Sequence, residues 1–487
     1  MTLSFDPDSL SLPNGHFIGS RLIEARGELP THRPSDAKAY WDCPVASADI
    51  VDQAVDTAQK ALKESGWASL RPRERTKAMQ RWADLIEQEA VPLAKMEAVG
   101  STRPVGHLIA GDIAVTAEQI RFFAEFADKE GSDLVPTADD SLGMIMTEAY
   151  GVVGAITPWN FPLSMAGWKL APALAAGNAV VLKPSEITPF STLYLAELAV
   201  RAGLPAGLIN IVLGDGPTTG SAITGHPGIA KVSFTGSTAA GAAIMTNIAR
   251  TGVKPMTLEL GGKSPQLVFA DADLDMAAGA IATSLLGNAG QACVAGSRLI
   301  VEAKVADVLV DAIIARLAAI RPGPTWNEAT DYPPIISERQ IGRMDSIVRA
   351  TVDGGAECLA GGKRLDCEGY FYAPTLISGV TATSPAVLEE IFGPVLTIQT
   401  FEDQEEALTL ADHPTYGLAA GLFTRDLSRA IRLTRRLQAG TVWVNRYGRS
   451  RDHILPTGGY KQSGIGKDLG REAYLANRKS KSVLISL

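Results

Sequence analysis

The sequence predicts an α/β protein built on parallel sheets. From Gly151 onward, short apolar runs alternate with segments of helical periodicity, which is typical of strand–helix–strand units with parallel strands. Polar motifs follow several of these runs directly, at the edge of a parallel sheet where ligands bind. The length of 487 residues favours two or three domains.

The composition indicates a soluble globular protein that binds no nucleic acid. The chain is 46% hydrophobic and 20% charged, and its formal net charge is -8, without a Lys/Arg-rich block. Its four cysteines form no Cys-x-x-Cys pair and there are only six histidines, so we expect no metal site and a reducing, cytoplasmic location. Residues 1–10 lack a signal-peptide pattern, and no apolar run has the length of a membrane span.

Helical periodicity dominates the first part of the chain. Ser47 has the position of an N-cap, and the apolar residues behind it repeat at helical spacing. Residues 73–99 predict a second helix, interrupted by Pro92, and residues 108–127 predict a third. We expect these helices to serve packing alone.

Two segments predict strands without a local partner. Polar turn residues within 132–148 lead into a strand pattern at 144–147, and the chain ends in a short strand at 481–486. An isolated ribbon needs something to pair with, so we interpret this region as a subunit contact.

Apolar runs predict the strands of two successive α/β units. Helices at 193–202 and 239–249 separate strands of the first unit. The predicted strands are 152–156, 179–182, 209–213, 231–234 and 257–260, followed by 298–301, 395–400, 418–423 and 441–445.

The most informative stretch is 287–294, which places Cys293 among small residues just after an apolar helical pattern. Small neighbours leave room for a ligand to reach the sulfur, as a catalytic nucleophile requires. A free cysteine is more often a small buried core residue, and this stretch alone leaves both interpretations open.

Polar residues at the predicted strand ends are further candidates, each with a structural alternative. Glu259 is either a general base or a solvated strand end. Asn160 could donate to an oxyanion or belong to a turn. Lys183 and Glu186 could hold the hydroxyls of an adenosine ribose, where an acid disfavours a 2′-phosphate, or form a surface ion pair.

A strand-to-helix junction at Gly236 and Ser237 could present backbone N–H groups to a phosphate, or Ser237 could be an ordinary N-cap. A looser glycine spacing at 214–220 contains Pro217, which lacks a donor. We interpret that segment as a turn.

Taken together, six motifs resemble the aldehyde dehydrogenase family. The motifs occur in the family's order, the numbers of residues between them suit the family, and the resemblance covers nearly the whole chain. The set is therefore far more specific than any one motif. The motifs are Thr-Pro-Trp-Asn-Phe-Pro at 157–162, Lys-Pro-Ser-Glu at 183–186, Phe-Thr-Gly-Ser at 234–237, Glu-Leu-Gly-Gly-Lys at 259–263, Gly-Gln-Ala-Cys at 290–293 and Glu-Ile-Phe-Gly-Pro at 390–394.

The resemblance implies NAD-dependent oxidation of an aldehyde to the acid through a thiohemiacetal and a thioester on Cys293. Asn160 would stabilise the oxyanion, and Glu259 would activate the hydrolytic water, which favours a free-acid product over a coenzyme A ester. NAD is the expected cofactor, with NADP left open. The cofactor-binding residues it implies are Trp159, Lys183, Glu186, Gly236, Ser237, Glu390 and Phe392.

The same resemblance implies a fold of three parts. A Rossmann-like NAD-binding domain would cover 1–130 and 150–258, and an α/β catalytic domain 259–456. A small β oligomerisation element would cover 131–149 and 457–487 and give a homodimer or homotetramer.

The resemblance places Phe161, Met165 and Trp168 along an apolar tunnel for a small-molecule aldehyde, where core packing is the alternative. The loop 446–453 departs from the family by its arginines and its length. We raise the hypothesis that Arg449 or Arg451 meets a substrate carboxylate, although a solvated loop or a subunit contact is the simpler interpretation.

Two other functions remain open. A cofactor-free thiol hydrolase could use Cys293 and Glu259 on esters. It would leave four residues without a role: Lys183, Glu186, Ser237 and Glu390. A structural protein that has kept the fold but lost turnover is disfavoured because Cys293, Glu259 and Asn160 are all intact.

Overall fold

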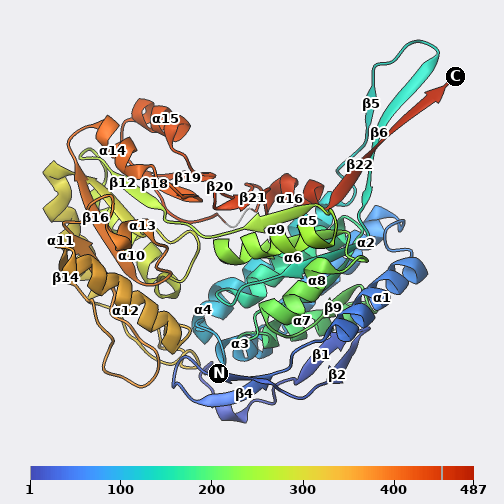
Figure 1. Ribbon diagram of the computed structural model, residues 1–487, viewed down its shortest axis with the longest axis horizontal. Coiled ribbons are helices and arrows are strands. Elements are labelled where there is room, and N and C mark those ends of the chain that lie inside the picture. The colour runs from blue at the N-terminus through green and yellow to red at the C-terminus, as the bar shows by residue number, and fades with distance from the viewer. Residues whose placement is uncertain (1, 451–452) are drawn as a thin grey trace.

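The computed structural model describes residues 2–450 and 453–487, arranged as two α/β units and a projecting β ribbon. Figure 1 shows the two units side by side, with the ribbon extending from the unit that contains the N-terminal half of the chain. The α/β class predicted from the alternation of strands and helices is confirmed.

The first sheet has eight strands in the order β2-β1-β9-β8-β7-β10-β11-β21. Antiparallel strands extend both edges: β2 (Arg21–Glu24) and β1 (Gly15–Ile18) on one side, β21 (Gly464–Ile465) on the other. The five central strands are parallel, and the apolar runs predicted all of them: β7 (Val152–Ile156), β8 (Ala179–Lys183), β9 (Ile209–Ile211), β10 (Lys231–Thr235) and β11 (Met256–Glu259).

The helices of this unit contribute most of its buried apolar core. Ser47 caps the first of them as predicted, because its side chain accepts a hydrogen bond from the Ile50 N–H. They are α1 (Ala48–Ser65), α2 (Pro72–Gln88), α3 (Ala90–Ala98), α4 (Val105–His107), α5 (Ile113–Phe126), α6 (Pro162–Ala175), α7 (Phe190–Arg201), α8 (Ser221–Gly225) and α9 (Thr238–Thr251).

The predicted position of one helix break is wrong. The segment 73–99 is interrupted at Glu89, between α2 and α3, and not at Pro92. Pro92 lies in the first turn of α3, where a backbone N–H has no intrahelical acceptor and proline is tolerated. The third predicted helix is continuous from α4 to α5 through a π-helical turn, η2 (Leu108–Asp112).

The second sheet has seven strands in the order β14-β15-β16-β13-β12-β18-β19, all parallel except β14 (Glu357–Ala360). Four strands match the predicted runs: β13 (Arg298–Glu302), β16 (Val395–Phe401), β18 (Ala419–Phe423) and β19 (Thr441–Val444). The strands β12 (Pro265–Val268) and β15 (Thr375–Ser378) were not predicted. Its helices are α10 (Leu274–Leu286), α11 (Ala306–Leu317), α12 (Glu338–Asp353), α13 (Pro385–Leu388), α14 (Gln404–Ala411) and α15 (Leu427–Arg436).

The ribbon is a three-stranded antiparallel sheet in the order β22-β6-β5. The C-terminal strand β22 (Arg478–Ser486) pairs along its whole length with β6 (Ser141–Ala149), and β5 (Asp133–Val135) lies on the other side of β6. The two segments that lacked a local partner in the sequence are therefore partners of each other (Figure 1).

Smaller elements complete the fold. Two-stranded sheets pair β3 (Leu29–His32) with β4 (Ala39–Cys43), and β17 (Tyr416–Gly417) with β20 (Tyr460–Lys461). The helix α16 (Gly470–Ala476) leads into β22. Within residues 2–450 and 453–487, no helix has the length and apolar character needed to cross a membrane.

Candidate active site

A cavity of about 510 Å³ lies where residues from the ends of the first sheet's strands meet residues from the second unit. The loop after β7 contributes Trp159 and Asn160, and the loop after β10 contributes Gly236 and Ser237. Cys293 and Glu390 enter from the second unit. Residues from five of the six motifs, far apart in the sequence, therefore lie around one thiol, whereas the Lys-Pro-Ser-Glu motif lies outside this cavity.

The loop that carries Cys293 has an unusual backbone. Asn288 and Ala289 both adopt left-handed conformations, with φ of 51° and 50°, and Gly290 continues the trend at 69°. Each non-glycine residue in this region costs about 1–2 kcal/mol, so the surrounding structure must hold the loop in place.

Buried side-chain amides supply that restraint. The Thr102 hydroxyl donates to Asn288 Oδ1 (2.7 Å), and Asn288 Nδ2 donates to the carbonyls of Asn160 (3.0 Å) and Gln291 (3.2 Å). The Gln291 side chain bonds to the Asn288 and Pro334 carbonyls and to the Ile336 N–H. Asn288 and Gln291 therefore fix the approach to Cys293, a role that we did not predict from the sequence.

Asn160 also lines the cavity and is held by the loop that carries Cys293. It follows β7 and precedes α6, and its Nδ2 donates one hydrogen bond to the Gln291 carbonyl (3.0 Å), two residues before Cys293. An amide carries two N–H donors, so this bond leaves the second one for a ligand. Asn160 Oδ1 is buried and has no partner among the described residues.

Opposing influences act on the thiol. Burial raises the pKa of Cys293 above its ordinary value, and the Glu259 and Glu390 carboxylates raise it further. The Arg449 guanidinium lowers this pKa and is the strongest charge acting on the sulfur. Arg449 therefore favours the thiolate, which is the reactive form.

Glu259 ends β11 and is 5% exposed. Burial, followed by repulsion from Asp468, raises the pKa of its carboxyl well above the usual value, while Lys169 lowers it. Lys169 Nζ donates to Asp468 Oδ2 (2.5 Å), and both side chains are buried. Since Glu259 also influences the pKa of Cys293, the carboxyl and the sulfur belong to one electrostatic group, although Glu259 does not line the cavity wall.

Glu390 rests on a glycine pair from the Glu-Leu-Gly-Gly-Lys motif. The Gly262 N–H donates to its Oε1 (2.9 Å), and a Cβ on Gly261 would lie 2.2 Å from its Oε2. Only glycine allows this approach at position 261. Beside it, the rings of Trp159 and Phe392 meet edge to face at 5.3 Å.

Lys183 ends β8 and Glu186 follows it, and both lie outside the cavity that contains Cys293. Lys183 Nζ donates to the carbonyls of Pro184 (2.7 Å) and Gly214 (2.8 Å) and lies 3.5 Å from Glu186 Oε2. Burial lowers the pKa of Lys183, and Glu186 acts against this. The two residues form an ion pair in this structure, but Lys183 is buried, so it is not the surface ion pair of the structural alternative. Their role toward a ribose stays a prediction.

The junction after β10 is partly occupied by its own hydrogen bonds. The Gly236 N–H donates to the Glu259 carbonyl (3.0 Å), and Ser237 caps α9 by accepting from the Ala240 N–H (3.2 Å). The donors that remain for a phosphate therefore belong to the first turn of α9, after Gly236. The looser glycine spacing at 214–220, which we interpreted as a turn, contains a single helical turn, η3 (Gly216–Gly220).

The predicted substrate residues separate into two groups. Phe161, Met165 and Arg449 line the cavity with Cys293. Trp168 does not line it, but its ring lies 4.8 Å from the Arg449 guanidinium carbon. Arg451 lies outside the described residues.

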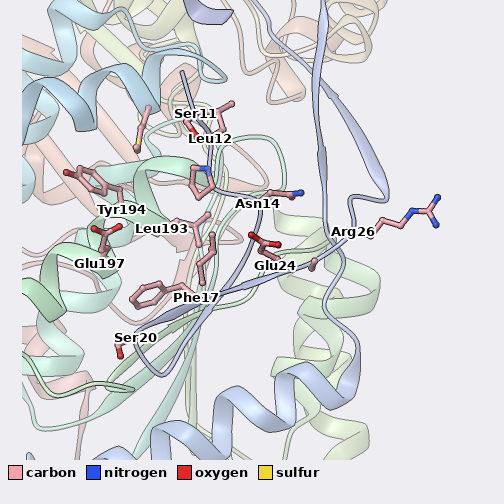
Figure 2. Close-up of a pocket in the computed structure, with 14 residues that line it drawn as sticks. Ser11, Leu12, Asn14, Phe17, Ser20, Glu24, Arg26, Leu193, Tyr194 and Glu197 are labelled. Carbon is pink, nitrogen blue, oxygen red and sulfur yellow. The ribbon is translucent and has the colours of Figure 1, made fainter. Parts of the chain in front are cut away.

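A second cavity, of about 870 Å³, lies between the N-terminal segment and α7 and contains none of the predicted site residues. Figure 2 shows its walls, with Phe17 from β1 facing Leu193 and Tyr194 from α7. Size alone would favour it, but the chemistry converges on the smaller cavity.

The fold and the cavity define a class of protein in which a thiol faces the ligand-binding edge of a parallel α/β sheet. The Aldehyde dehydrogenase family model matches residues 23–483. An aldehyde dehydrogenase of Aspergillus niger is 40% identical over 463 residues, covering 95% of this chain and 93% of that protein. The chain therefore belongs to the aldehyde dehydrogenase family and is an enzyme that oxidises aldehydes.

Solved structures agree with this assignment. An indole-3-acetaldehyde dehydrogenase of P. syringae, in complex with NAD+ and IAA, matches with a TM-score of 0.96 and 38% identity, covering 99% of this chain and 98% of that one. A gamma-glutamyl-gamma-aminobutyraldehyde dehydrogenase of Burkholderia cenocepacia matches with a TM-score of 0.95 and 37% identity, with the same coverage. Structures of nearly equal similarity carry different substrate names, so similarity does not assign the aldehyde.

Proposed function

We propose that this enzyme uses NAD to oxidise an aldehyde on Cys293 and releases the free acid through Glu259. The observation that carries the proposal is the convergence of Cys293, Asn160 and Glu390 on one cavity, with Glu259 in the same electrostatic group. Each of the three chemical tasks, nucleophilic attack, oxyanion stabilisation and water activation, then has a residue of suitable type.

The first step is attack by the Cys293 thiolate on the aldehyde carbon, which forms a C–S bond and places negative charge on the former carbonyl oxygen. The second N–H of Asn160 and the Cys293 backbone N–H are the donors that stabilise this charge. Because Gln291 holds the Asn160 amide, the donor needs no reorganisation during the reaction.

The last step is hydrolysis. Glu259 takes a proton from water as the oxygen attacks the thioester carbon, and the C–S bond breaks to give the acid and the regenerated thiolate. A raised pKa makes Glu259 a stronger base once it is ionised. Within the Lys169–Asp468 pair, Asp468 raises this pKa and Lys169 lowers it.

The chain's donor set fits NAD. Glu390 presents a half-buried carboxylate against a glycine pair for one ribose, and the Lys183–Glu186 pair lies at the strand end for the other. The first turn of α9 supplies backbone N–H groups for the diphosphate, and Thr235 Oγ1 nearby is buried without a partner among the described residues. When bound, NAD supplies the acceptor for the hydride that leaves the thiohemiacetal.

The carboxylate of Glu186 favours NAD over NADP, because it would repel a 2′-phosphate. We expect kcat/KM to be higher with NAD than with NADP, and Glu186→Gln to narrow the difference. Equal use of both cofactors by the unaltered enzyme would contradict this assignment.

The ribbon is proposed as the contact between subunits of a homodimer or homotetramer. The strand β22 has one free edge in the described chain, and Leu134 and Leu484 of the ribbon are more than two-thirds exposed. Free edges and exposed apolar residues favour association with another chain. Leu484→Lys should lower the mass measured by light scattering, and an unchanged mass would contradict the proposal.

The direct test is the formation of NADH from NAD and a panel of aldehydes. We expect turnover that Cys293→Ala abolishes and that Cys367→Ala, a change at an exposed cysteine, leaves intact. Ester cleavage without any NADH would instead identify a thiol hydrolase.

A further inference from the structure

Arg449 is a cation in the wall of the cavity that contains the thiol. Its guanidinium is held from two sides: the Trp168 ring lies 4.8 Å from its central carbon, and its Nη2 donates to Thr457 Oγ1 (2.7 Å). Thr457 is itself anchored, because its backbone exchanges two hydrogen bonds with that of Asp468 (2.7 and 2.9 Å). The side chain is therefore preorganised rather than free to extend into solvent.

The other arginines near the cavity have carboxylate partners. Arg103 lies against the ring of Phe161 but is paired with Asp112 (2.7 Å). Arg343 lines the cavity and is paired with Glu389 (3.5 Å). Arg449 lowers the pKa of the Glu259 carboxyl, but among residues 2–450 and 453–487 no carboxylate forms an ion pair with Arg449. A guanidinium has five donors, of which Thr457 uses one.

Apolar and aromatic side chains lie near Arg449. Phe161 and Met165 line the same cavity, and Trp168 lies against the guanidinium. Weak solvation strengthens the attraction between a fixed cation and an anion, and the guanidinium fork matches the two oxygens of a carboxylate.

We propose that Arg449 binds a carboxylate carried by the substrate, so that the enzyme's substrates are aldehyde acids with an apolar or aromatic body. This proposal rests on the proposed function of the same cavity. It makes Arg449 a specificity-determining residue, with Trp168 and Thr457 as the positioning residues that hold its fork.

The competing role is electrostatic. Arg449 lowers the pKa of both Cys293 and Glu259, so it could serve these two groups alone and be indifferent to the substrate's charge. That role predicts an equal loss of rate for charged and neutral substrates when Arg449 is replaced. The two roles are therefore distinguished by the ratio of kcat/KM for a charged substrate to that for a neutral one, and not by either value alone.

The first test compares 4-formylbenzoate with its methyl ester, two aldehydes that differ in charge at one end. In Arg449→Gln, the ratio of their kcat/KM values should fall by about 10- to 100-fold, as expected for the loss of a charge-assisted hydrogen-bond pair. In Arg449→Lys this ratio should fall less, because lysine keeps the positive charge but lacks the paired donors of the guanidinium. The control is Arg446→Gln, at an exposed arginine of the same loop that does not line the cavity, and it should leave the ratio unchanged. An unchanged ratio in Arg449→Gln overturns the proposal.

The second test needs neither NAD nor an aldehyde, so it remains informative if the proposed function fails. Iodoacetate and iodoacetamide both alkylate a thiolate, but only iodoacetate carries a carboxylate. In Arg449→Gln, we expect the rate of Cys293 alkylation by iodoacetate to fall relative to the rate with iodoacetamide. A lowered thiolate fraction alone would slow both reagents equally. If the unaltered enzyme oxidises no aldehyde with NAD, the proposed function is refuted. If Arg449→Gln slows alkylation by iodoacetate and by iodoacetamide equally, the role of Arg449 is refuted.

Discussion

Replacement of Asn288 by alanine tests whether the strained loop positions the thiol. Asn288 is 2% exposed, and its side chain makes hydrogen bonds to Thr102, Asn160 and Gln291. Asn288→Ala leaves the Thr102 hydroxyl and the Asn160 carbonyl without these partners, and each unpaired buried group costs about 1–3 kcal/mol. Alanine also tolerates the left-handed backbone less well than asparagine.

Allowing for partial relaxation, we expect the free energy of unfolding to fall by about 2–4 kcal/mol, which lowers Tm by several degrees in a chain of this size. The catalytic effect should be separate and larger. Displacement of a catalytic group by about 1 Å can cost 100-fold, so kcat/KM should fall by about 10- to 100-fold. The assays are thermal denaturation, steady-state kinetics and the rate of Cys293 alkylation by iodoacetamide.

Asn178 offers a matched control. It is also fully buried, and its side chain bonds to the Gly151 N–H and to the carbonyls of Ala173 and Asn477, outside the cavity. Asn178→Ala should lower Tm to a similar extent and leave the alkylation rate of Cys293 nearly unchanged. If Asn288→Ala loses stability but keeps its rates, the loop is not what positions the thiol.

Three further predictions follow from individual contacts. Gly261→Ala places a Cβ 2.2 Å from Glu390 Oε2 and should raise the KM for NAD about tenfold; Gly279→Ala, whose Cβ meets nothing closer than 4.0 Å, should leave KM unchanged. Burial raises the pKa of Glu97 from 4.5 to about 8, so the folded state retains a proton that the unfolded state releases. Tm should therefore fall as pH rises from about 5 to 8, and Glu97→Gln should remove most of that fall; a parallel decline in both proteins would contradict this. Glu259 must be ionised to act, and its pKa is raised, so the rate of thioester hydrolysis should rise with pH along a limb whose midpoint lies above the usual glutamate pKa; a limb at the usual value would be inconsistent with its burial.

The sequence predicted the strands that carry the site because they are continuous apolar runs bounded by polar motifs. Each of the five central strands of the first sheet lies where an apolar run predicted it, within a few residues. The strands β1 (Gly15–Ile18) and β12 (Pro265–Val268) were missed because the first is short and contains a histidine, and the second begins with proline directly after a motif.

Side-chain contacts between distant segments of the chain could not be predicted from a single sequence. The Thr102–Asn288 hydrogen bond joins residues 186 positions apart, and neither belongs to a residue pair that composition or periodicity singles out. Likewise, the loop 446–453 showed several arginines, but only the folded chain distinguishes Arg449, which lines the cavity, from Arg446, which is exposed. The sequence thus predicted residues that line the cavity better than it predicted the side chains that hold them in place.

The central claim is that Cys293 carries the acyl group before water releases it. The most direct measurement uses Glu259→Gln, mixed with NAD and an aldehyde, quenched in acid and digested for mass spectrometry. The account predicts the mass of the acyl group on the peptide that contains Cys293, together with one equivalent of NADH. NADH formation without a modified Cys293, or an acyl group on another residue, would contradict it.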